Sequence, residues 1–492
     1  MDGLDTLLLG CAPPRLAELL RRAPWMDGSG RAAPRFDVLD QAALGEFRLL
    51  LVAPVGGPPS RWFVPVADHG QGPEAAGAAA YDRAVVRALR EGLRLPTARG
   101  GLIEFQGDPA DFRGQLPFDP GWSSNSLTLI DLGGAAHAHK TYRRLDTGNR
   151  EPELLRLMAP GGRTQRLVGD YGYREPGTGR REPLGVVYAY AAGDGLDVPL
   201  RDSLRALWEP VADGLDPATA ADRARQRLAE PLRGAGRFLR GFHHELAQRL
   251  GPAPEFPVPG YRAGTAARTA ELRPRILADA RFPVAVRRRA LAALDREAAL
   301  VRRLPPAAPP SGPSHGDLHL SHFLRRETPG GWEMCVIDLS TPVLDPDDPA
   351  SAQSPWQDLV GLLRGLECFT ADEFAHQAAI ALDLDSDETC RTALLCAAGE
   401  PPDTPGWTPE RLETLERLRG TAQLWSAGVA RLLLDGYRDD DRTMGRTGGA
   451  ELSRHPAWRM FRLRRLVHEL AYAYAHDRAY HAAINLRHAV EA

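Results

Sequence analysis

The chain has 492 residues, enough for about two or three domains. With a formal net charge of -3, we expect no electrostatic binding of the whole chain to a nucleic acid or an anionic membrane. Its 43% hydrophobic and 25% charged residues are ordinary for a globular protein. The five cysteines form no CxxC pair, residues 1–25 lack a signal-peptide pattern, and no apolar run is long enough to span a bilayer, so we expect a cytoplasmic protein.

The first hundred-odd residues predict a small sheet accompanied by helices. Leucines at helical spacing occur within residues 1–25, strand patterns follow at 36–40, 47–52 and 62–66, and residues 81–93 have the pattern of an amphipathic helix. Nothing in this stretch indicates catalytic chemistry. We therefore expect it to form a structural cap.

A strand lysine followed by a helix glutamate comes next in the chain. A polar turn runs into a strand pattern over 123–131, and a second strand pattern over 135–141 contains Lys140. A helix pattern then carries Glu153, with Glu151 as a rival at its start. In kinases such a lysine and glutamate position the phosphates of ATP. On these residues alone, a surface lysine on an edge strand is the favoured interpretation.

Residues 199–250 predict helices, and a proline-rich stretch over 305–313 leads the chain toward the next motif. His243 and His244 lie beside an apolar helical stripe. We interpret them as a solvated or capping pair rather than as a metal site.

The most informative stretch contains the motif HGDLHL and, about twenty residues later, an apolar strand over 334–337 that ends in Asp338. Two acids on short connections between small strands can face one pocket. Phosphoryl transfer needs one carboxylate to accept the hydroxyl proton and another to hold Mg²⁺ on the phosphates. HGD alone is as compatible with a surface hairpin. Together with the following strand it favours Asp317 as the base and Asp338 as the metal ligand.

The remainder of the chain predicts helices. One opens at Pro355, with Asp358 in its first turn, where a carboxylate suits the helix N-terminus and is expected to brace the HGD turn. Apolar and aromatic stripes mark two further long helices, over 410–433 and 461–474.

These patterns resemble a known family. The motif HGDLHL with its following strand, the run from Lys140 to Leu145 and the helix at 355–364 resemble kinases with the aminoglycoside-phosphotransferase fold, above all the maltokinase-type sugar kinases and also the glucosamine kinases. The resemblance extends from about residue 120 to the end of the chain. It implies an α+β, bilobal, protein-kinase-like fold with a cap at 1–116, a nucleotide-binding lobe at 117–195 and a mostly helical lobe at 196–492.

The resemblance also implies a function and a set of site residues. The implied activity is ATP- and Mg²⁺-dependent phosphorylation of a sugar hydroxyl, as in the conversion of maltose to maltose 1-phosphate. Kinases of glucosamine or of an aminoglycoside or aminocyclitol are the alternatives on the same scaffold. A serine- and asparagine-rich turn replaces a glycine-rich phosphate loop, and the final helices wall the acceptor site. The implied residues are Ser124, Asn125 and Ser126 for the nucleotide, with Lys140 and Glu153, and His319, Glu469 and Tyr472 for the acceptor.

Two departures from the family pattern concern the metal. His322 stands where the family has Asn or Gln, and Asp338 is followed by Leu339 and Ser340 instead of an aromatic residue and an acid. An imidazole suits softer metals than Mg²⁺. The candidate metal ligands are Asp338 and His322. Either Asp338 holds the metal with substrate phosphates and water completing its shell, or activity is lost and the chain is a pseudokinase that binds without catalysis.

Overall fold

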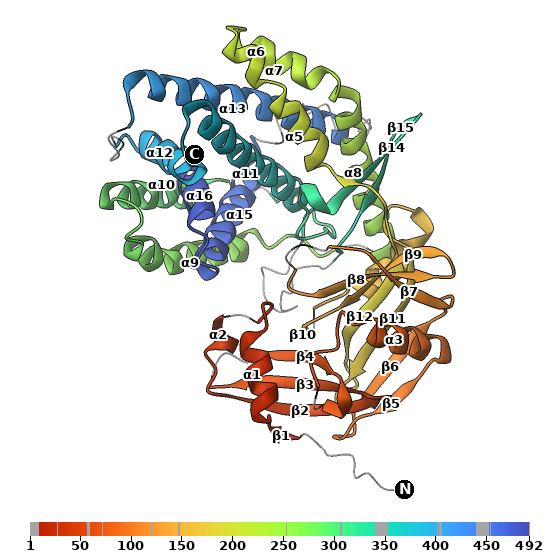
Figure 1. The fold of residues 1–492 in the computed structure, drawn as a ribbon. Coiled ribbons are helices and arrows are strands. Elements are labelled where there is room, and N and C mark those ends of the chain that lie inside the picture. The colour runs from red at the N-terminus through yellow and green to blue at the C-terminus, as the bar shows by residue number, and fades with distance from the viewer. Residues whose placement is uncertain are drawn as a thin grey trace, which may run out of the picture. The chain divides into compact units, whose positions relative to one another are not determined.

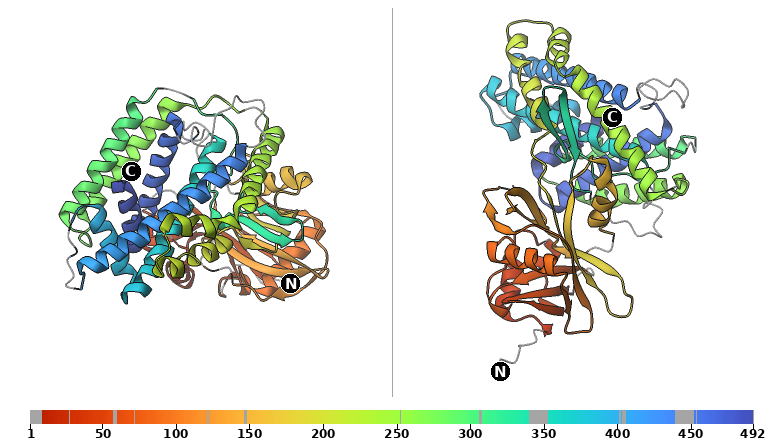
Figure 2. Two further views of the ribbon diagram at one scale, coloured as in Figure 1. Left: turned by 90° about the horizontal axis from the view of Figure 1, so that it is seen from above. Right: turned by 90° about the vertical axis from the view of Figure 1, so that its right-hand side faces the viewer.

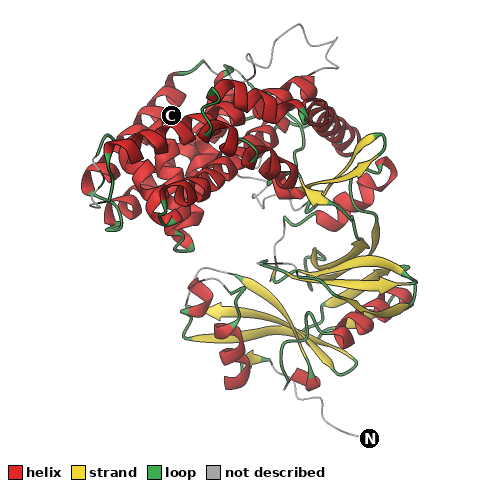
Figure 3. Ribbon diagram, turned by 45° about the horizontal axis from the view of Figure 1, so that its top comes forward, coloured by secondary structure: helices red, strands yellow, loops and turns green. Residues whose placement is uncertain are grey.

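The computed structural model divides into two compact units. The first comprises the residues up to 191 together with 338–339, and the second comprises 192–337 and the chain from 353 onward. The structure describes residues 9–491, with the exception of 27, 57–59, 71, 120, 122, 146–147, 252, 306–307, 340–352, 401, 403–405, 439–451 and 453. Figure 3 shows that strands dominate the first unit and helices the second.

One sheet of the first unit is five-stranded, with the order β1-β2-β3-β4-β10 and antiparallel pairing throughout. Its strands are β1 (Gly10–Cys11), β2 (Arg35–Leu44), β3 (Phe47–Val55), β4 (Arg61–Val66) and β10 (Arg144–Leu145). Because side chains alternate between the two faces of a strand, β3 serves two cores. Leu49 and Leu51 belong to one, and Leu50 and Val52 belong to the other.

The other sheet of this unit is seven-stranded and antiparallel, in the order β5-β6-β11-β12-β9-β8-β7. Its strands are β5 (Arg94–Pro96), β6 (Leu102–Gly107), β7 (Phe112–Leu116), β8 (Ser126–Leu132), β9 (Ala135–Thr141), β11 (Leu167–Arg174) and β12 (Arg181–Ala189). The helices are α1 (Pro14–Arg22), α2 (Gly28–Arg31), α3 (Ala79–Glu91) and α4 (Glu151–Met158). Helix α3 packs along this sheet and adds Tyr81, Val85 and Leu89 to its core (Figure 1).

The predicted boundary after residue 116 does not separate compact units. Strands β5 to β7 precede it and β8 follows it, yet all four belong to the seven-stranded sheet. Conversely, β10 follows the boundary but pairs with β4, which precedes it, in the five-stranded sheet. The predicted cap and nucleotide lobe therefore exchange strands and form one unit, whereas the chain enters the second unit at Ala192, close to the other predicted boundary.

The second unit contains a small sheet in the order β13-β14-β15 and a set of long helices. The strands are β13 (Asp194–Gly195), β14 (Phe323–Thr328) and β15 (Gly331–Val336). The helices are α5 (Asp197–Arg205), α6 (Trp208–Ala212), α7 (Pro217–Gln226), α8 (Ala229–Leu250), α9 (Val258–Ala278), α10 (Val284–Arg303), α11 (Pro355–Leu382), α12 (Ser386–Ala397), α13 (Pro409–Arg438), α15 (Pro456–Ala475) and α16 (Ala479–Glu491). Figure 2 shows α9 and α10 side by side, and α11 packs against α13 and α15.

Helices α8 and α13 approach closely at a pair of glycines. A Cβ atom on Gly236 would lie 2.2 Å from the carbonyl oxygen of Leu433, and one on Gly436 would lie 2.0 Å from that of Arg233. Neither helix backbone has room for a side chain here. The two glycines therefore set the distance between the helices.

The predicted α+β class is confirmed, with the strand-rich part before the helical part. Within the described part of the chain, none of the helices combines the length and the apolar character that crossing a membrane requires.

Candidate active site

Lys140 lies at the centre of the first unit's candidate site. It is on β9, whose main chain is paired on both sides, with Leu127 of β8 and Val186 of β12 as its partners. Its Nζ donates to Glu151 Oε2 at 2.8 Å and to Asp338 Oδ1 at 2.5 Å. Burial lowers the pKa of Lys140, but the charges of Glu151 and Asp338 outweigh burial and raise it above its ordinary value. The lysine is therefore a fixed positive charge.

The glutamate that pairs with Lys140 is Glu151 and not Glu153, which corrects the prediction. Glu151 begins α4 on the buried side of the helix, which it shares with Leu154, Leu155 and Met158. Glu153 faces the other way and accepts from Arg150 Nε at 2.9 Å in a half-exposed pair. The apolar positions three, four and seven residues after Glu151 are the signal that distinguishes the two glutamates.

The serine- and asparagine-rich turn connects β7 with β8, immediately before the lysine strand. The Asn125 N–H donates to Ser123 Oγ at 3.1 Å, and Asn125 Oδ1 accepts from the Arg143 N–H at 3.2 Å. Ser124 is exposed, and Ser126 begins β8 opposite Thr141. The turn is thus tied to the chain that follows Lys140.

In the second unit, the HGD turn is held by its main chain. Asp358 accepts from the His315 N–H at 2.6 Å and from the Gly316 N–H at 2.8 Å, and Gly316 has a left-handed φ of 88°. This confirms the expected brace. The Asp317 N–H donates to His315 Nδ1 at 3.3 Å, which leaves Nε2–H to donate to the Ile337 carbonyl at 2.8 Å. His315 therefore links the turn to the peptide that precedes Asp338.

Helix α11 begins where it does because of a capping box. Ser354 Oγ accepts from the Trp356 N–H, and Gln357 Oε1 accepts from the Ser354 N–H at 2.7 Å. This places Asp358 one turn inside, where His243 Nε2 also lies 2.9 Å from its carboxylate. His243 is buried, so its interpretation as a solvated histidine was wrong.

Two further histidines pack beside Asp317. His319 and His322 have ring centroids 3.5 Å apart. His322 Nδ1 lies 3.1 Å from the Asp317 carbonyl oxygen, which can only accept, so Nδ1 carries a proton, and in the neutral imidazole Nε2 then has the lone pair. The tautomer is compatible with Nε2 as a metal ligand.

The Asp317 side chain has an arginine partner that the sequence prediction missed. Arg465 Nη1 donates to Asp317 Oδ1 at 2.9 Å, and Arg465 Nε donates to Glu469 Oε1 at 3.1 Å. Glu469 Oε2 in turn accepts from Arg364 Nη2 at 2.8 Å. Burial raises the pKa of Asp317, but the charge of Arg465 more than offsets burial and lowers it. The spacing of Arg465 and Glu469 on one helix was the available signal.

The three residues that we predicted to contact the acceptor lie in different surroundings. Glu469 joins the ion-pair chain that reaches Asp317, and His319 packs on His322 in the same turn region. Tyr472 lies one turn beyond Glu469, with its ring 4.3 Å from that of His476 and 5.2 Å from the Arg478 guanidinium. These contacts of Tyr472 are with His476 and Arg478 and not with the ion-pair chain of Asp317.

The donor set fits a Mg²⁺ ion in part. No group of three or more His, Cys, Asp or Glu side chains that could hold a metal occurs within the described ranges. A Mg²⁺ ion commonly uses one or two carboxylates together with phosphates and water, so Asp338 fits that pattern. Ser340, the second departure after Asp338, lies outside the described residues.

Comparisons with known proteins give a family match for part of the chain and similar folds. Residues 187–394 match the model of the phosphotransferase enzyme family. The structure is similar to a glucosamine kinase in complex with glucosamine, ADP and inorganic phosphate, with a TM-score of 0.54, 20% identity, and coverage of 96% of this chain and 98% of that chain. Crystal form B of glucosamine kinase gives a TM-score of 0.57, 19% identity, and coverage of 96% and 98%. No curated protein matches this sequence.

The resemblance inferred from the HGDLHL motif is confirmed for the fold and, over residues 187–394, by the family match, and the finer resemblance to maltokinases stays a prediction. Residues 187–394 of this chain match the phosphotransferase enzyme family, and the chain has that family's protein-kinase-like fold.

Proposed function

We propose that this protein is an ATP-dependent kinase that phosphorylates a hydroxyl group of a sugar, with maltose as the acceptor to which the sequence resemblance points. The observation that carries the proposal is the buried Lys140 between Glu151 and Asp338. Burying a lysine with two carboxylates is costly, and apolar residues would fill the same space at no such cost. The arrangement suits an anchor for phosphate oxygens.

In this proposal Asp317 accepts the proton of the acceptor hydroxyl. The acceptor oxygen forms a bond to the γ-phosphorus, the bond from that phosphorus to the bridging oxygen breaks, and ADP leaves. Because Arg465 binds Oδ1, we expect the other carboxylate oxygen to receive the proton. A loose transition state makes positioning more important than base strength, so a lowered pKa of Asp317 is compatible with this role.

The remaining residues position the nucleotide. Lys140 would bind phosphate oxygens and Glu151 would orient it, while backbone amides of the turn at 123–126 would face the phosphates. Asp338 and His322 would hold Mg²⁺, which when bound neutralises charge on the phosphates.

The test is acceptor-dependent ADP formation over a panel of maltose, glucosamine and aminoglycosides. Asp317→Asn should lower turnover by about a hundredfold or more, because the amide cannot accept the proton, and its thermal unfolding should match that of the parent. Near-normal turnover in the variant would remove Asp317 from the role.

The panel also addresses the alternative from another class. If ATP with Mg²⁺ stabilises the protein but no acceptor supports ADP formation, the chain is a binding module and the kinase proposal fails.

A further inference from the structure

The carboxylates around Asp317 are each bound by arginines. Within the second unit, Asp317 is bound by Arg465, and Glu469 is bound by both Arg465 and Arg364. The exposed fraction of the side chain is 49% at Asp317, 16% at Glu469 and 2% at Arg364. Solvent exposure therefore decreases from Asp317 through Glu469 to Arg364. Asp317 lies at the solvent-facing end.

Glu469 has both carboxylate oxygens committed to these arginines. Oε1 accepts from Arg465 Nε and Oε2 accepts from Arg364 Nη2, which also donates to Asn485 Oδ1 at 2.8 Å. Burial raises the pKa of Glu469, but the charges of Arg364 and Arg465 more than compensate and lower it. Glu469 is thus an ionised carboxylate whose charge is already balanced.

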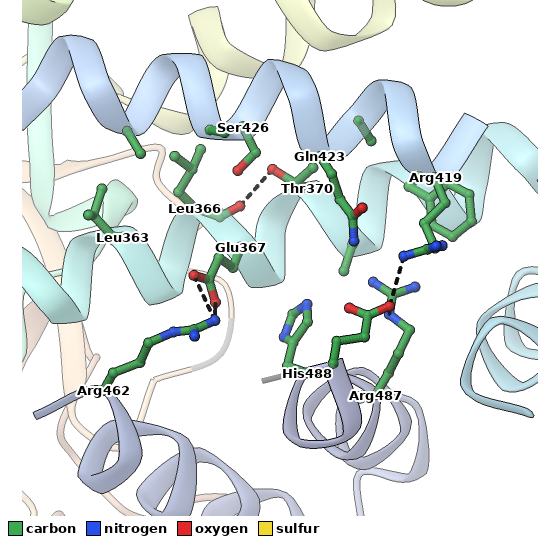
Figure 4. Close-up of a pocket in the computed structure, with 16 residues that line it drawn as sticks. Leu363, Leu366, Glu367, Thr370, Arg419, Gln423, Ser426, Arg462, Arg487 and His488 are labelled. Atoms are coloured by element: carbon green, nitrogen blue, oxygen red, sulfur yellow. Dashed lines mark hydrogen bonds and ion pairs between the residues drawn. The ribbon is translucent and has the colours of Figure 1, made fainter. Parts of the chain in front are cut away.

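The neighbouring pocket repeats this pattern. A cavity of about 300 Å³ lies among α11, α13, α15 and α16, and its lining includes Glu367 and Glu491 (Figure 4). Glu367 is bound by Arg462 at 3.2 Å and by Arg364, and Glu491 is bound by Arg419 at 3.0 Å. Arg487 adds a longer pairing to Glu491, at 3.8 Å.

An amino sugar carries an ammonium group, which loses its hydration on binding and needs a carboxylate in return. In the described part of this region, each carboxylate named above already has an arginine that balances its charge, so an ammonium would bring a second positive charge to an ion pair that is already neutral. It would also approach the positive charge of Arg465. A sugar hydroxyl meets neither obstacle, because it can both donate to a carboxylate and accept from a guanidinium.

We propose that the acceptor is an uncharged sugar, recognised through hydroxyl groups, and that Arg465 is the residue that excludes amino sugars. The inference rests on the proposed kinase function, because it assumes that the acceptor lies at Asp317. It separates this chain from a kinase of glucosamine, even though the two share a fold.

Glucose and glucosamine test the inference directly, since they differ only in a hydroxyl or an ammonium group at one carbon. We would measure ADP formation with these two sugars, maltose and N-acetylglucosamine, and measure binding of the same sugars by calorimetry. The best neutral sugar should exceed glucosamine by about tenfold or more in kcat/KM and in affinity.

The outcomes distinguish the two proposals. Glucosamine as an equal or better acceptor overturns the inference and leaves the kinase function intact. ADP formation with none of the sugars contradicts the kinase function, and the binding data then decide the inference. Neutral sugars binding more tightly than glucosamine would support it, and no preference or no binding would overturn it.

Variants of Arg465 test its part in the discrimination. Arg465→Gln removes the positive charge, so the ratio of glucosamine to neutral-sugar kcat/KM should rise by about tenfold. Arg465→Lys keeps the charge and should keep the ratio near that of the parent. Arg459→Gln is the control, because Arg459 lies on the same helix and forms an ion pair with Glu297. A loss of activity that is equal for both acceptors in Arg465→Gln would reduce Arg465 to a structural role.

Discussion

Lys140 is one side chain that binds carboxylates from two separate parts of the chain. Its strand is paired on both sides, and its two carboxylates come from α4 and from a residue 198 positions later. Glu151 also accepts from the Tyr142 hydroxyl at 2.6 Å. Burial and the charge of Glu151 raise the pKa of Tyr142 well above its ordinary value, so this hydroxyl stays a donor.

The lysine pair can be tested with a matched control on the same helix. Lys140→Ala and Glu151→Gln should raise the KM for ATP and lower kcat, because the phosphate anchor is lost or no longer oriented. Glu153→Gln should leave both constants near those of the parent, since Glu153 forms its ion pair with Arg150 and not with Lys140. Steady-state kinetics with varied ATP gives the answer. An effect of Glu153→Gln as large as that of Glu151→Gln would contradict the assignment.

His322 is one of the positions at which this chain departs from the pattern of the family that it resembles. If its Nε2 binds the metal, replacing it with the family's Gln should preserve or raise activity with Mg²⁺ and lower the ratio of Mn²⁺ to Mg²⁺ activity, because imidazole favours the softer ion. The measurement is initial rate with each metal for both proteins. An identical ratio in parent and His322→Gln would rule out a ligand role.

The sequence suffices to propose site residues that belong to a contiguous motif. Lys140, Asp317 and Asp338 follow from motifs that resemble a known kinase family, and Glu151 could have been chosen over Glu153 from helical periodicity alone. Arg465 could not be assigned to Asp317, because the ion pair joins residues 148 positions apart on separate elements. Ion pairs of this kind depend on how helices pack, which local patterns do not specify.

At the scale of elements, the helix α11 supports the HGD turn. Its capping box fixes where the helix begins, and that register directs Asp358 to two main-chain N–H groups of the HGD turn. A shift of one residue would rotate Asp358 by about 100° around the helix axis. The start of the helix and the geometry of the turn are therefore coupled.

The glycine crossing between α8 and α13 gives a second matched test. Gly436→Ala places a methyl group against a main-chain carbonyl and should cost about 1–3 kcal/mol of unfolding free energy. Gly420→Ala on the same helix meets no atom within 4 Å and should be neutral or stabilising by up to about 1 kcal/mol. Chemical denaturation measures both. Equal effects of the two substitutions would show that the crossing does not set the helix distance.

Strands and helices were predicted more reliably than their grouping. The strand containing Lys140 and the helix over 81–93 appear as β9 and α3. The two-residue strand β10 has no sequence pattern of its own, because its pairing depends on the position of β4. This exchange of strands is why the predicted boundary at 116 does not divide the molecule.

At the scale of the whole molecule, buried histidine and carboxylate groups determine how stability changes with pH. Burial and the nearby Arg364, Arg487 and Arg462 lower the pKa of His488 well below 6.5. Between that lowered pKa and 6.5 the unfolded chain binds a proton that the folded chain does not, so acidification favours unfolding there. Glu469, whose pKa is lowered from 4.5, adds a second loss at lower pH.

The melting temperature should therefore fall as the pH drops below about 6.5, before the carboxylates contribute. His488→Gln, which cannot take up the proton, should flatten this part of the curve. His244→Gln, at an exposed position on α8, should leave the curve unchanged. Thermal unfolding from about pH 8 to pH 5 tests this. A curve of the same shape in parent and His488→Gln would contradict the prediction.

The ion pair between Lys140 and Asp338 also affects when this site can form during synthesis of the chain. A ribosome adds about 5–20 residues per second, so Asp338 emerges roughly 10–40 s after Lys140. The described strands of both large sheets lie before residue 190, so they can pair during that interval. Until residue 338 is made, Glu151 alone of the two carboxylates can neutralise the lysine. The strands of the first unit can thus pair before the residue that completes the site of Lys140 has been made.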